Sequence, residues 1–242
     1  MNVKMIIQYD GTDFCGSQTQ PDQRTVQSEF EKALGSLLNE NISTIFSGRT
    51  DSGVHAKEQT LNFNTANTSI PAEKMIYPLN SRLPNDILAL SSELAGDSFN
   101  SRFDAKRRTY RYFIRRTPEL FRNRYSLIYP YKIDLYRLNS AAELFIGKKD
   151  FQAFCSTHAE VNNYICSIDS LRFFTRDDET VMEISSDRFL QNMVRIIVST
   201  FLELNSNRIT EADIKVILDK KDRRLSPKTI SPKGLFLWKV EY

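Results

Sequence analysis

Residues 47 to 56 read SGRTDSGVHA, a stretch that places an acid in an unusual setting. Two glycines bracket an arginine, an aspartate and two hydroxyl residues, so charge and hydrogen-bonding groups gather where the backbone is freest. Arg49 stands two residues before Asp51, and an arginine beside a carboxylate favours its ionised form. Asp51 is therefore either the acid of an Asx turn or a carboxylate kept ionised as a nucleophile, a stabiliser or a base.

The sequence on both sides of this stretch predicts groups of strands and helices. Apolar residues recur with a period of two in the expected strands and at helical spacing in the expected helices. We expect helices over 25–39, 71–84, 135–147, 190–205 and 211–221, and strands over 5–11, 42–48, 59–65, 86–95, 108–114, 165–175, 179–186 and 235–242. Because strands adjoin in pairs instead of strictly alternating with helices, the pattern favours two successive α+β halves over one doubly wound sheet.

We expect these halves to join near residues 96 to 106. The N-terminal half, 1–100, contains the Asp51 stretch, and the C-terminal half, 101–242, contains the longest predicted helix. No stretch approaches the ~18 apolar residues of a membrane span. The apolar run near the N-terminus is far shorter than that of a signal peptide. We therefore expect a globular cytoplasmic protein with no membrane partner.

The cysteines do not predict a disulfide framework or a zinc ribbon, because they are three in number and have no CxxC spacing. Cys155 and His158 stand at CxxH spacing, with Cys166 nearby. Structural zinc sites usually have four ligands, and this cluster offers three. We expect reduced thiols in the core and no metal.

Positive charge is concentrated in two segments, although the net charge is only +3. Residues 102–124 carry nine Lys or Arg and two acids, residues 220–233 carry six and one, and the rest of the chain sums to −9. Such a distribution is typical of proteins that bind polyanions, and a solvated surface joined by salt bridges is the alternative. Tyr110, Tyr112 and Phe113 lie among the basic residues and offer stacking surfaces, which favours a nucleic acid as the partner.

The helix expected at 190–205 contains a charged residue in an apolar setting. Apolar side chains cover one face and extend to the other sides, so the helix should be buried. Val198 and Leu202 flank the direction of Arg195. Because a buried guanidinium without a carboxylate is costly, Arg195 predicts an acid elsewhere in the chain. The alternatives are that its side chain reaches solvent or pairs with a structural acid.

Several common chemistries are excluded by missing motifs. GTDFCG and GRTDSG have the glycine spacing of a P-loop but lack the Lys and the Ser or Thr that follow. The chain has no GxGxxG, GxSxG or HExxH motif and only two histidines. A hydrolase with paired carboxylates would need a second positioned acid, and Asp10 and Asp13 are more typical of turn residues.

SGRTDSGVHA resembles the signature of the TruA-type tRNA pseudouridine synthases, which is GRTD, a small residue and then GVHA. The resemblance continues along essentially the whole chain in the family's order. It includes YDGTDFCGSQTQ and RTVQSEFEKAL near the start, LNSRLPNDI at 79–87, FNSRFDAKRRTYRYFI at 99–114, KDFQAF at 149–154, FLQNMVRIIV at 189–198 and the closing GLFLWKVEY.

This resemblance implies the pseudouridine synthase fold. In that fold two similar halves, each a mostly antiparallel sheet with helices on one face, have their sheets joined side by side around a central RNA-binding cleft. The implied reaction is the isomerisation of uridine to pseudouridine in the anticodon stem-loop of tRNA, at positions 38 to 40 of tRNA. The resemblance further implies a homodimer that needs no cofactor.

Carried over by position, Asp51 is the catalytic aspartate, which either attacks the sugar or assists its deprotonation. Arg195 matches the arginine that pairs with this aspartate. Asp51 is then the acidic partner that the helix predicts for Arg195. Tyr110 matches the tyrosine that stacks on the uracil and faces the C5 proton. Arg49 matches the residue that helps to displace the target base, since a base in a stem must be flipped out first. Further predicted substrate contacts are Thr50, His55, Arg107, Arg108 and Arg111.

The chain departs from the family pattern at four places. Ser17 stands where the family usually has a tryptophan, and Ser199 stands where the long helix usually has a glycine. VNNYICSI lacks the customary arginine before the next strand, and SPKTISPKG lacks the usual alanine-rich character. None of these positions is one of the four catalytic matches, so we expect the chemistry to be retained on tRNA. The alternatives are a paralogue that acts on another RNA, such as ribosomal RNA, and a non-catalytic RNA-binding relative.

Overall fold

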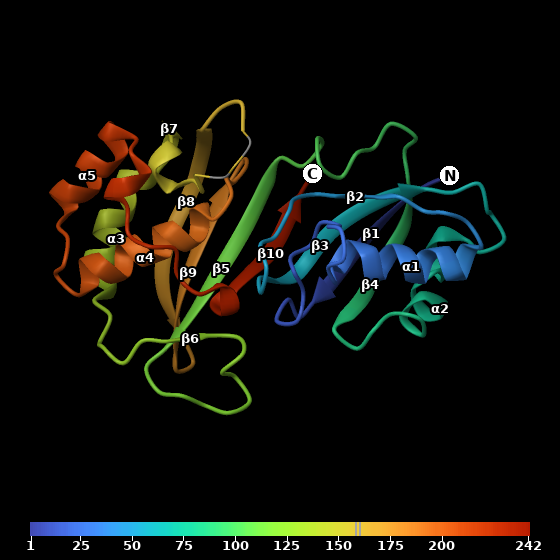
Figure 1. Ribbon diagram of the computed structural model, residues 1–242, viewed down its shortest axis with the longest axis horizontal. Helices are drawn as coiled ribbons and strands as arrows, with labels where there is room; N and C mark the ends of the chain where they lie inside the picture. Colours follow the sequence, from blue (N-terminus) through green and yellow to red (C-terminus); the bar gives the residue numbers. More distant parts are fainter. Residues whose placement is uncertain (158, 160) are drawn as a thin grey trace. The chain divides into compact units, whose positions relative to one another are not determined.

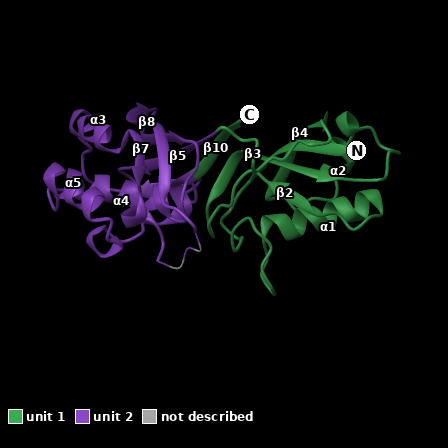
Figure 2. Ribbon diagram, turned by 90° about the horizontal axis from the view of Figure 1, so that it is seen from above, with its two compact units in different colours: residues 1–106, 236–242 green, residues 107–235 purple. Residues whose placement is uncertain are grey.

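The computed structural model describes residues 1–157, 159 and 161–242, and Figure 1 traces its helices and strands. The chain forms two compact units, which Figure 2 shows in different colours. Unit 1 comprises residues 1–106 and 236–242, and unit 2 comprises residues 107–235. Within the described part of the chain, every helix is too short or too polar to cross a membrane.

Unit 1 is built on a sheet with the strand order β4-β1-β3-β10. Its elements are β1 (Asn2–Tyr9), α1 (Val26–Leu38), β2 (Thr44–Phe46), β3 (His55–Asn64), the 3-10 helix η1 (Ala72–Lys74), α2 (Ile76–Asn80), β4 (Ile87–Ala95) and β10 (Leu235–Glu241). β1 runs antiparallel to β3 and β4, whereas β10 runs parallel to β3. One edge of β3 is shared, because β10 pairs with its first residues and β2 pairs with its last ones.

The sequence periods account for the core of unit 1. In β1, Val3, Met5 and Ile7 are fully buried, as the two-residue period of a half-buried strand requires. α1 begins at a capping box made by Thr25 and Ser28, which confirms the helix expected there. Its buried residues recur at helical spacing and are Val26, Phe30, Ala33, Leu34 and Leu38.

Unit 2 is built on an antiparallel sheet with the strand order β5-β9-β8-β7. Its elements are β5 (Arg107–Arg115), β6 (Leu127–Ile128), α3 (Leu135–Ala142), η2 (Glu143–Phe145), β7 (Gly147–Asp150), η3 (Gln152–Phe154), β8 (Ile165–Arg176), β9 (Glu179–Ser186), α4 (Met193–Asn205), α5 (Glu211–Lys220), η4 (Arg223–Leu225) and η5 (Pro232–Gly234). The two-residue β6 pairs in parallel with the end of β5.

α4 is the most buried helix element of unit 2, as its sequence predicts. Every residue of α4 is buried except Arg195, Glu203 and Asn205. The ring of Phe201 lies 4.9 Å from that of Phe173 on β8, measured between centroids, so the helix packs against the sheet. The predicted class, two α+β halves with mostly antiparallel sheets, is confirmed.

The structure differs from the predicted elements at short segments. The helix expected at 135–147 ends as an α-helix at Ala142 and continues as the 3-10 turn η2. β6 and β7 were not expected, because strands of two and four residues are too short to show a period.

The last strand also lies in a different unit from the one expected. We expected residues 101–242 to form one half, but β10 joins the sheet of unit 1, where Phe236 pairs with His55 and Leu237 with Ala56. Tyr242 further donates a hydrogen bond from its hydroxyl to Ser101 O at 2.9 Å. The alternation of apolar residues identifies a strand but not the strand it pairs with.

A stability prediction follows from the close packing of Gly11, just after β1. A Cβ on Gly11 would lie 2.0 Å from Val54 O and 2.5 Å from Val54 C, which are backbone atoms with little room to move. We expect Gly11→Ala to lower the free energy of unfolding by about 3 kcal/mol, the upper end of the usual cost of overpacking. The measurement is urea unfolding followed by circular dichroism.

Gly96→Ala is the matched control, because a Cβ there would meet nothing within 4 Å. We expect it to change the free energy of unfolding by no more than about 0.5 kcal/mol, as for other surface changes. Equal stability of the two variants would contradict the packing argument.

Candidate functional site

The SGRTDSGVHA stretch forms the connection from β2 to β3, and we call residues 47–54 the β2–β3 loop. Gln59, which is fully buried on β3, donates a hydrogen bond from Nε2 to Gly48 O at 2.9 Å. At the other end of the loop, Val54 N donates to Asp51 O at 3.1 Å and closes a turn. The backbone on both sides of the acid is therefore fixed.

The side chains of this loop differ in exposure. Arg49 is exposed, Thr50 is buried and Asp51 is half-buried. Thr50 points into the unit, where its hydroxyl lies 2.8 Å from the hydroxyl of Tyr9. Burial raises the pKa of Tyr9 to about 12, so its hydroxyl keeps its proton at neutral pH. Thr50 thus anchors the two residues beside it, the exposed Arg49 and the half-buried Asp51.

His55 follows this loop at the start of β3 and is packed inside unit 1. Its side chain is fully buried, and its ring stacks on that of Phe236 with 4.5 Å between centroids. Gly11 N donates a hydrogen bond to Nδ1 of the same ring at 3.0 Å. These contacts favour a supporting role for His55, and its predicted contact with a substrate stays a prediction.

In unit 2, Tyr110 lies in the middle of β5. It is 8% exposed, and its ring meets the ring of Phe189 edge-on at 5.1 Å between centroids. Two residues along the same strand face, Tyr112 is fully buried and donates its hydroxyl proton to Ser231 O at 2.7 Å. The Tyr110 ring therefore has a defined orientation on a rigid strand.

Arg195 is half-buried near the start of α4 and is held by two neutral acceptors of its own unit. Its Nε donates to Ile230 O at 2.8 Å, and its Nη1 donates to Asn192 Oδ1 at 2.8 Å. Both hydrogen bonds fix the position of the guanidinium at the start of the helix. The predicted anion is Asp51, which belongs to unit 1, so their pairing stays a prediction.

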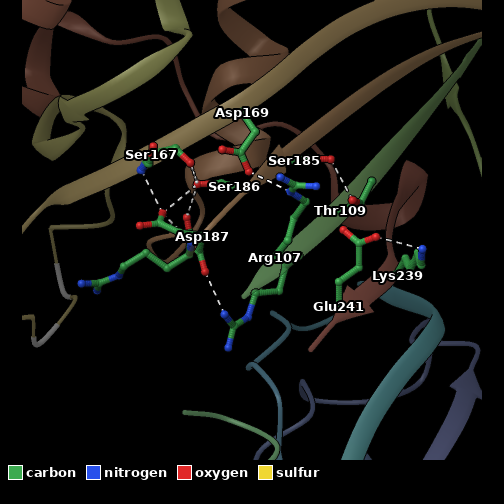
Figure 3. A network of polar contacts seen from close by, with 11 residues as sticks. Arg107, Thr109, Ser167, Asp169, Ser185, Ser186, Asp187, Lys239 and Glu241 are labelled. Carbon is green, nitrogen blue, oxygen red and sulfur yellow. Dashed lines mark hydrogen bonds and ion pairs between the residues drawn. The ribbon is translucent and has the colours of Figure 1, made fainter. Parts of the chain in front are cut away.

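Arg107 and Arg108 begin β5, and Figure 3 shows the polar network around Arg107. Arg107 Nε lies 2.8 Å from Asp169 Oδ2, in a pair that is 47% and 40% exposed. Arg108 donates from Nη1 to the backbone oxygen of Asp187 at 2.8 Å. Exposed ion pairs contribute little stability. The predicted contacts of Arg107 and Arg108 with the substrate stay predictions.

Arg111 lies on the opposite face of β5 from Tyr110, because side chains alternate along a strand. Its Nε lies 2.6 Å from Glu183 Oε2, and Arg172 binds the other oxygen of that carboxylate at 2.6 Å. Burial by itself raises the pKa of Glu183, but hydrogen bonds from the two arginines outweigh it and lower that pKa. Arg111 thus belongs to an ion-pair cluster on the face of β5 opposite to Tyr110. Its predicted contact with the substrate stays a prediction.

Two of the three residues considered as metal ligands are buried thiols. Burial raises the pKa of Cys166 to about 12 and also raises that of Cys155, so both keep their protons at neutral pH. The third residue, His158, lies outside the described residues. Among the residues that the structure describes, no group of three or more potential ligands is close enough to hold a metal ion.

Three residues that fix the β2–β3 loop were not predicted as part of the site. Tyr9 and Gln59 have no motif that would mark them, since each reads as an ordinary strand residue. Ser17 was noted as a departure from the family pattern, but the sequence does not reveal that it contacts Thr50. Its hydroxyl accepts a hydrogen bond from Thr50 N at 2.8 Å.

Comparison with known proteins finds one family model that matches two segments of this chain. The family model described as tRNA pseudouridine synthase matches this chain at residues 5–104 and again at residues 141–242. The two matches together cover most of the chain. A solved structure described as a Cbf5-Nop10-Gar1 complex aligns with 81% of this chain and 52% of that chain at 8% identity and a TM-score of 0.37.

Curated relatives match over their full length. The tRNA pseudouridine synthase A of an Exiguobacterium species is 40% identical over 99% of this chain and 97% of the relative. Those of Bacillus licheniformis and Clostridium acetobutylicum are 41% and 42% identical over 100% of this chain and 99% of each relative. This chain therefore belongs to the tRNA pseudouridine synthase family and is an isomerase that acts on uridine in RNA.

Proposed function

We propose that this protein converts uridine to pseudouridine in the anticodon stem-loop, at positions 38 to 40 of tRNA, as a cytoplasmic homodimer without a cofactor. The observation that carries the proposal is the complete GRTDSGVHA match, with Asp51 on a loop whose backbone is fixed on both sides. The names of the full-length relatives support tRNA as the substrate.

The reaction rearranges the atoms of one nucleotide. The bond from uracil N1 to the sugar carbon breaks, the base turns, and C5 forms a bond to the same carbon. N1 gains a proton and C5 loses one, so composition is unchanged. Two roles are open to Asp51: its carboxylate bonds to the sugar carbon and is then displaced by C5, or it takes a proton from the sugar and returns it.

The other residues take roles that fit their places in the structure. Tyr110 stacks on the uracil with its hydroxyl directed at the C5 proton, and Arg195 pairs with the carboxylate of Asp51. Arg49 is exposed next to the acid, where it displaces the target base from its stem. The further substrate contacts are Arg107, Arg108, Arg111, Thr50 and His55. Thr50 and His55 also hold the β2–β3 loop.

Removal of the carboxylate is the direct test of this assignment. We expect Asp51→Asn and Asp51→Ala to lower turnover at least ~1,000-fold, the scale of loss when a catalytic group is removed. Binding of tRNA should persist, because phosphate contacts dominate affinity. The measurements are tritium release from C5-labelled tRNA and filter binding.

Asp97→Asn makes the same chemical change at an exposed position of unit 1 and should leave turnover unchanged. Normal turnover by either Asp51 variant would refute the proposed function. Loss of turnover in the Asp97 control as well would mean that the assay reports on something other than the carboxylate of Asp51.

Mapping of pseudouridines identifies the substrate. In RNA from cells that lack the gene, we expect pseudouridine to be lost at positions 38 to 40 of tRNA and retained in ribosomal RNA. Loss in ribosomal RNA alone would support the paralogue, and an unchanged map would support the non-catalytic RNA-binding relative.

The affinity for tRNA should fall steeply as salt rises. Each phosphate contact contributes about 0.7 to 0.9 to the slope of log K against log salt, because bound counterions are released. We expect Arg107→Gln and Arg108→Gln each to reduce this slope by about 1. Arg208→Gln removes the same charge outside both basic segments, from a residue paired with Glu203 at 2.5 Å, and should leave the slope unchanged. A slope near zero for the wild-type protein would exclude backbone binding.

A further inference from the structure

Ser17 contacts both peptide groups of Thr50, the residue before Asp51. Its hydroxyl oxygen accepts a hydrogen bond from Thr50 N at 2.8 Å, and its own N–H donates to Thr50 O at 3.1 Å. Ser17 is 1% exposed, so water does not compete for these bonds. We call this pair of bonds the Ser17–Thr50 clamp.

The clamp is anchored to the rest of unit 1. Ser17 O accepts a hydrogen bond at 2.9 Å from Gln27 N in the first turn of α1. On the opposite side, the hydroxyl of Tyr9 lies 2.8 Å from that of Thr50. All three polar groups of Thr50 are therefore held, by a helix on one side and by a strand on the other.

The neighbouring residue makes this close approach possible. Gly16 has a φ of +91°, and a Cβ there would lie 2.9 Å from Thr50 O. A side chain at this position would be strained and would push the two backbones apart. The short segment before α1 is thus shaped to lie directly against Thr50.

The clamp fixes the peptide planes on both sides of Thr50, and the second of these planes contains the nitrogen of Asp51. Because Asp51 O is held by Val54 N, the backbone of the acid is fixed at both ends. The carboxylate then moves only by rotation about its own side-chain bonds. We infer that Ser17 is a positioning residue, which sets the direction of the Asp51 carboxylate through Thr50. This inference rests on the proposed function of Asp51.

The residue type at position 17 suits this role. A serine hydroxyl has lone pairs that accept hydrogen bonds, and here its oxygen accepts from Thr50 N. The hydroxyl thereby keeps a buried N–H satisfied.

Two substitutions of nearly equal shape isolate the hydroxyl. Ser17→Thr keeps it, and Ser17→Val replaces it with a methyl group, so both carry the same extra bulk. We expect Ser17→Val to lower kcat about 10- to 100-fold relative to Ser17→Thr, the cost of a misplaced catalytic group. KM for tRNA should stay within about two-fold of wild type, since phosphate contacts dominate binding.

A matched control separates positioning from loss of folded protein. Ser101 is fully buried in unit 1, and its hydroxyl has no hydrogen-bond partner among the described residues. Ser101→Ala should leave kcat unchanged. All rates are divided by the folded fraction measured from circular dichroism melts, so a purely structural effect disappears from the comparison.

The possible outcomes separate this inference from the proposed function. Equal kcat for Ser17→Val and Ser17→Thr, with Asp51→Asn inactive, would overturn the role of Ser17 alone. Normal turnover by Asp51→Asn would overturn the proposed function. If Ser17→Val does not fold, Tyr9→Phe tests the same anchoring of Thr50 from the other side. A lower kcat at unchanged KM would then support the inference, and a wild-type kcat would overturn it.

Discussion

The buried peptide groups of the β2–β3 loop must be hydrogen-bonded, and other segments of unit 1 supply their partners. A buried donor or acceptor left without a partner costs about 1–3 kcal/mol. Ser47 solves part of the problem, because its N–H donates to Thr60 O at 2.8 Å and its hydroxyl donates to Gln59 Oε1 at 2.5 Å. Gln59 in turn reaches Gly48 O. The loop has no regular secondary structure of its own, and these hydrogen bonds to β3 hold it in place.

Ion pairs divide the basic residues of unit 2 into two groups, which a count of charges does not distinguish. Arg115 is 4% exposed and forms an ion pair with Glu119 at 2.7 Å, in a cluster that also contains Asp178 and Glu179. Arg111 is likewise committed to Glu183. A buried charge pairs within the protein because desolvation is costly, so such arginines stabilise the sheet. The charge of +7 in residues 102–124 therefore includes arginines that already pair with carboxylates of unit 2.

Regular elements could be predicted from the sequence because their periods are local, whereas the supports of the site depend on contacts between distant segments. The helical spacing of apolar residues predicts α1 and α4. The misfit of Arg195 predicts an acid elsewhere in the chain, and that partner stays a prediction. The motif locates Asp51 in a loop. No pattern within a few residues shows that Tyr9 and Ser17 meet at Thr50, 41 positions beyond Tyr9 and 33 beyond Ser17. The pairing of β10 with β3 also joins distant segments, so it could not be predicted from the sequence.

Gly16 and Ser17 together bring the segment before α1 against Thr50. Two hydrogen bonds from one residue to both peptide groups of another require the two backbones to lie side by side. Gly16 meets this requirement, since its φ of +91° turns the chain and no Cβ separates it from Thr50 O. Once the backbones are adjacent, a short hydroxyl reaches Thr50 N without help from a larger side chain. A serine therefore fits at position 17 because a glycine precedes it, and the two residues act as one unit.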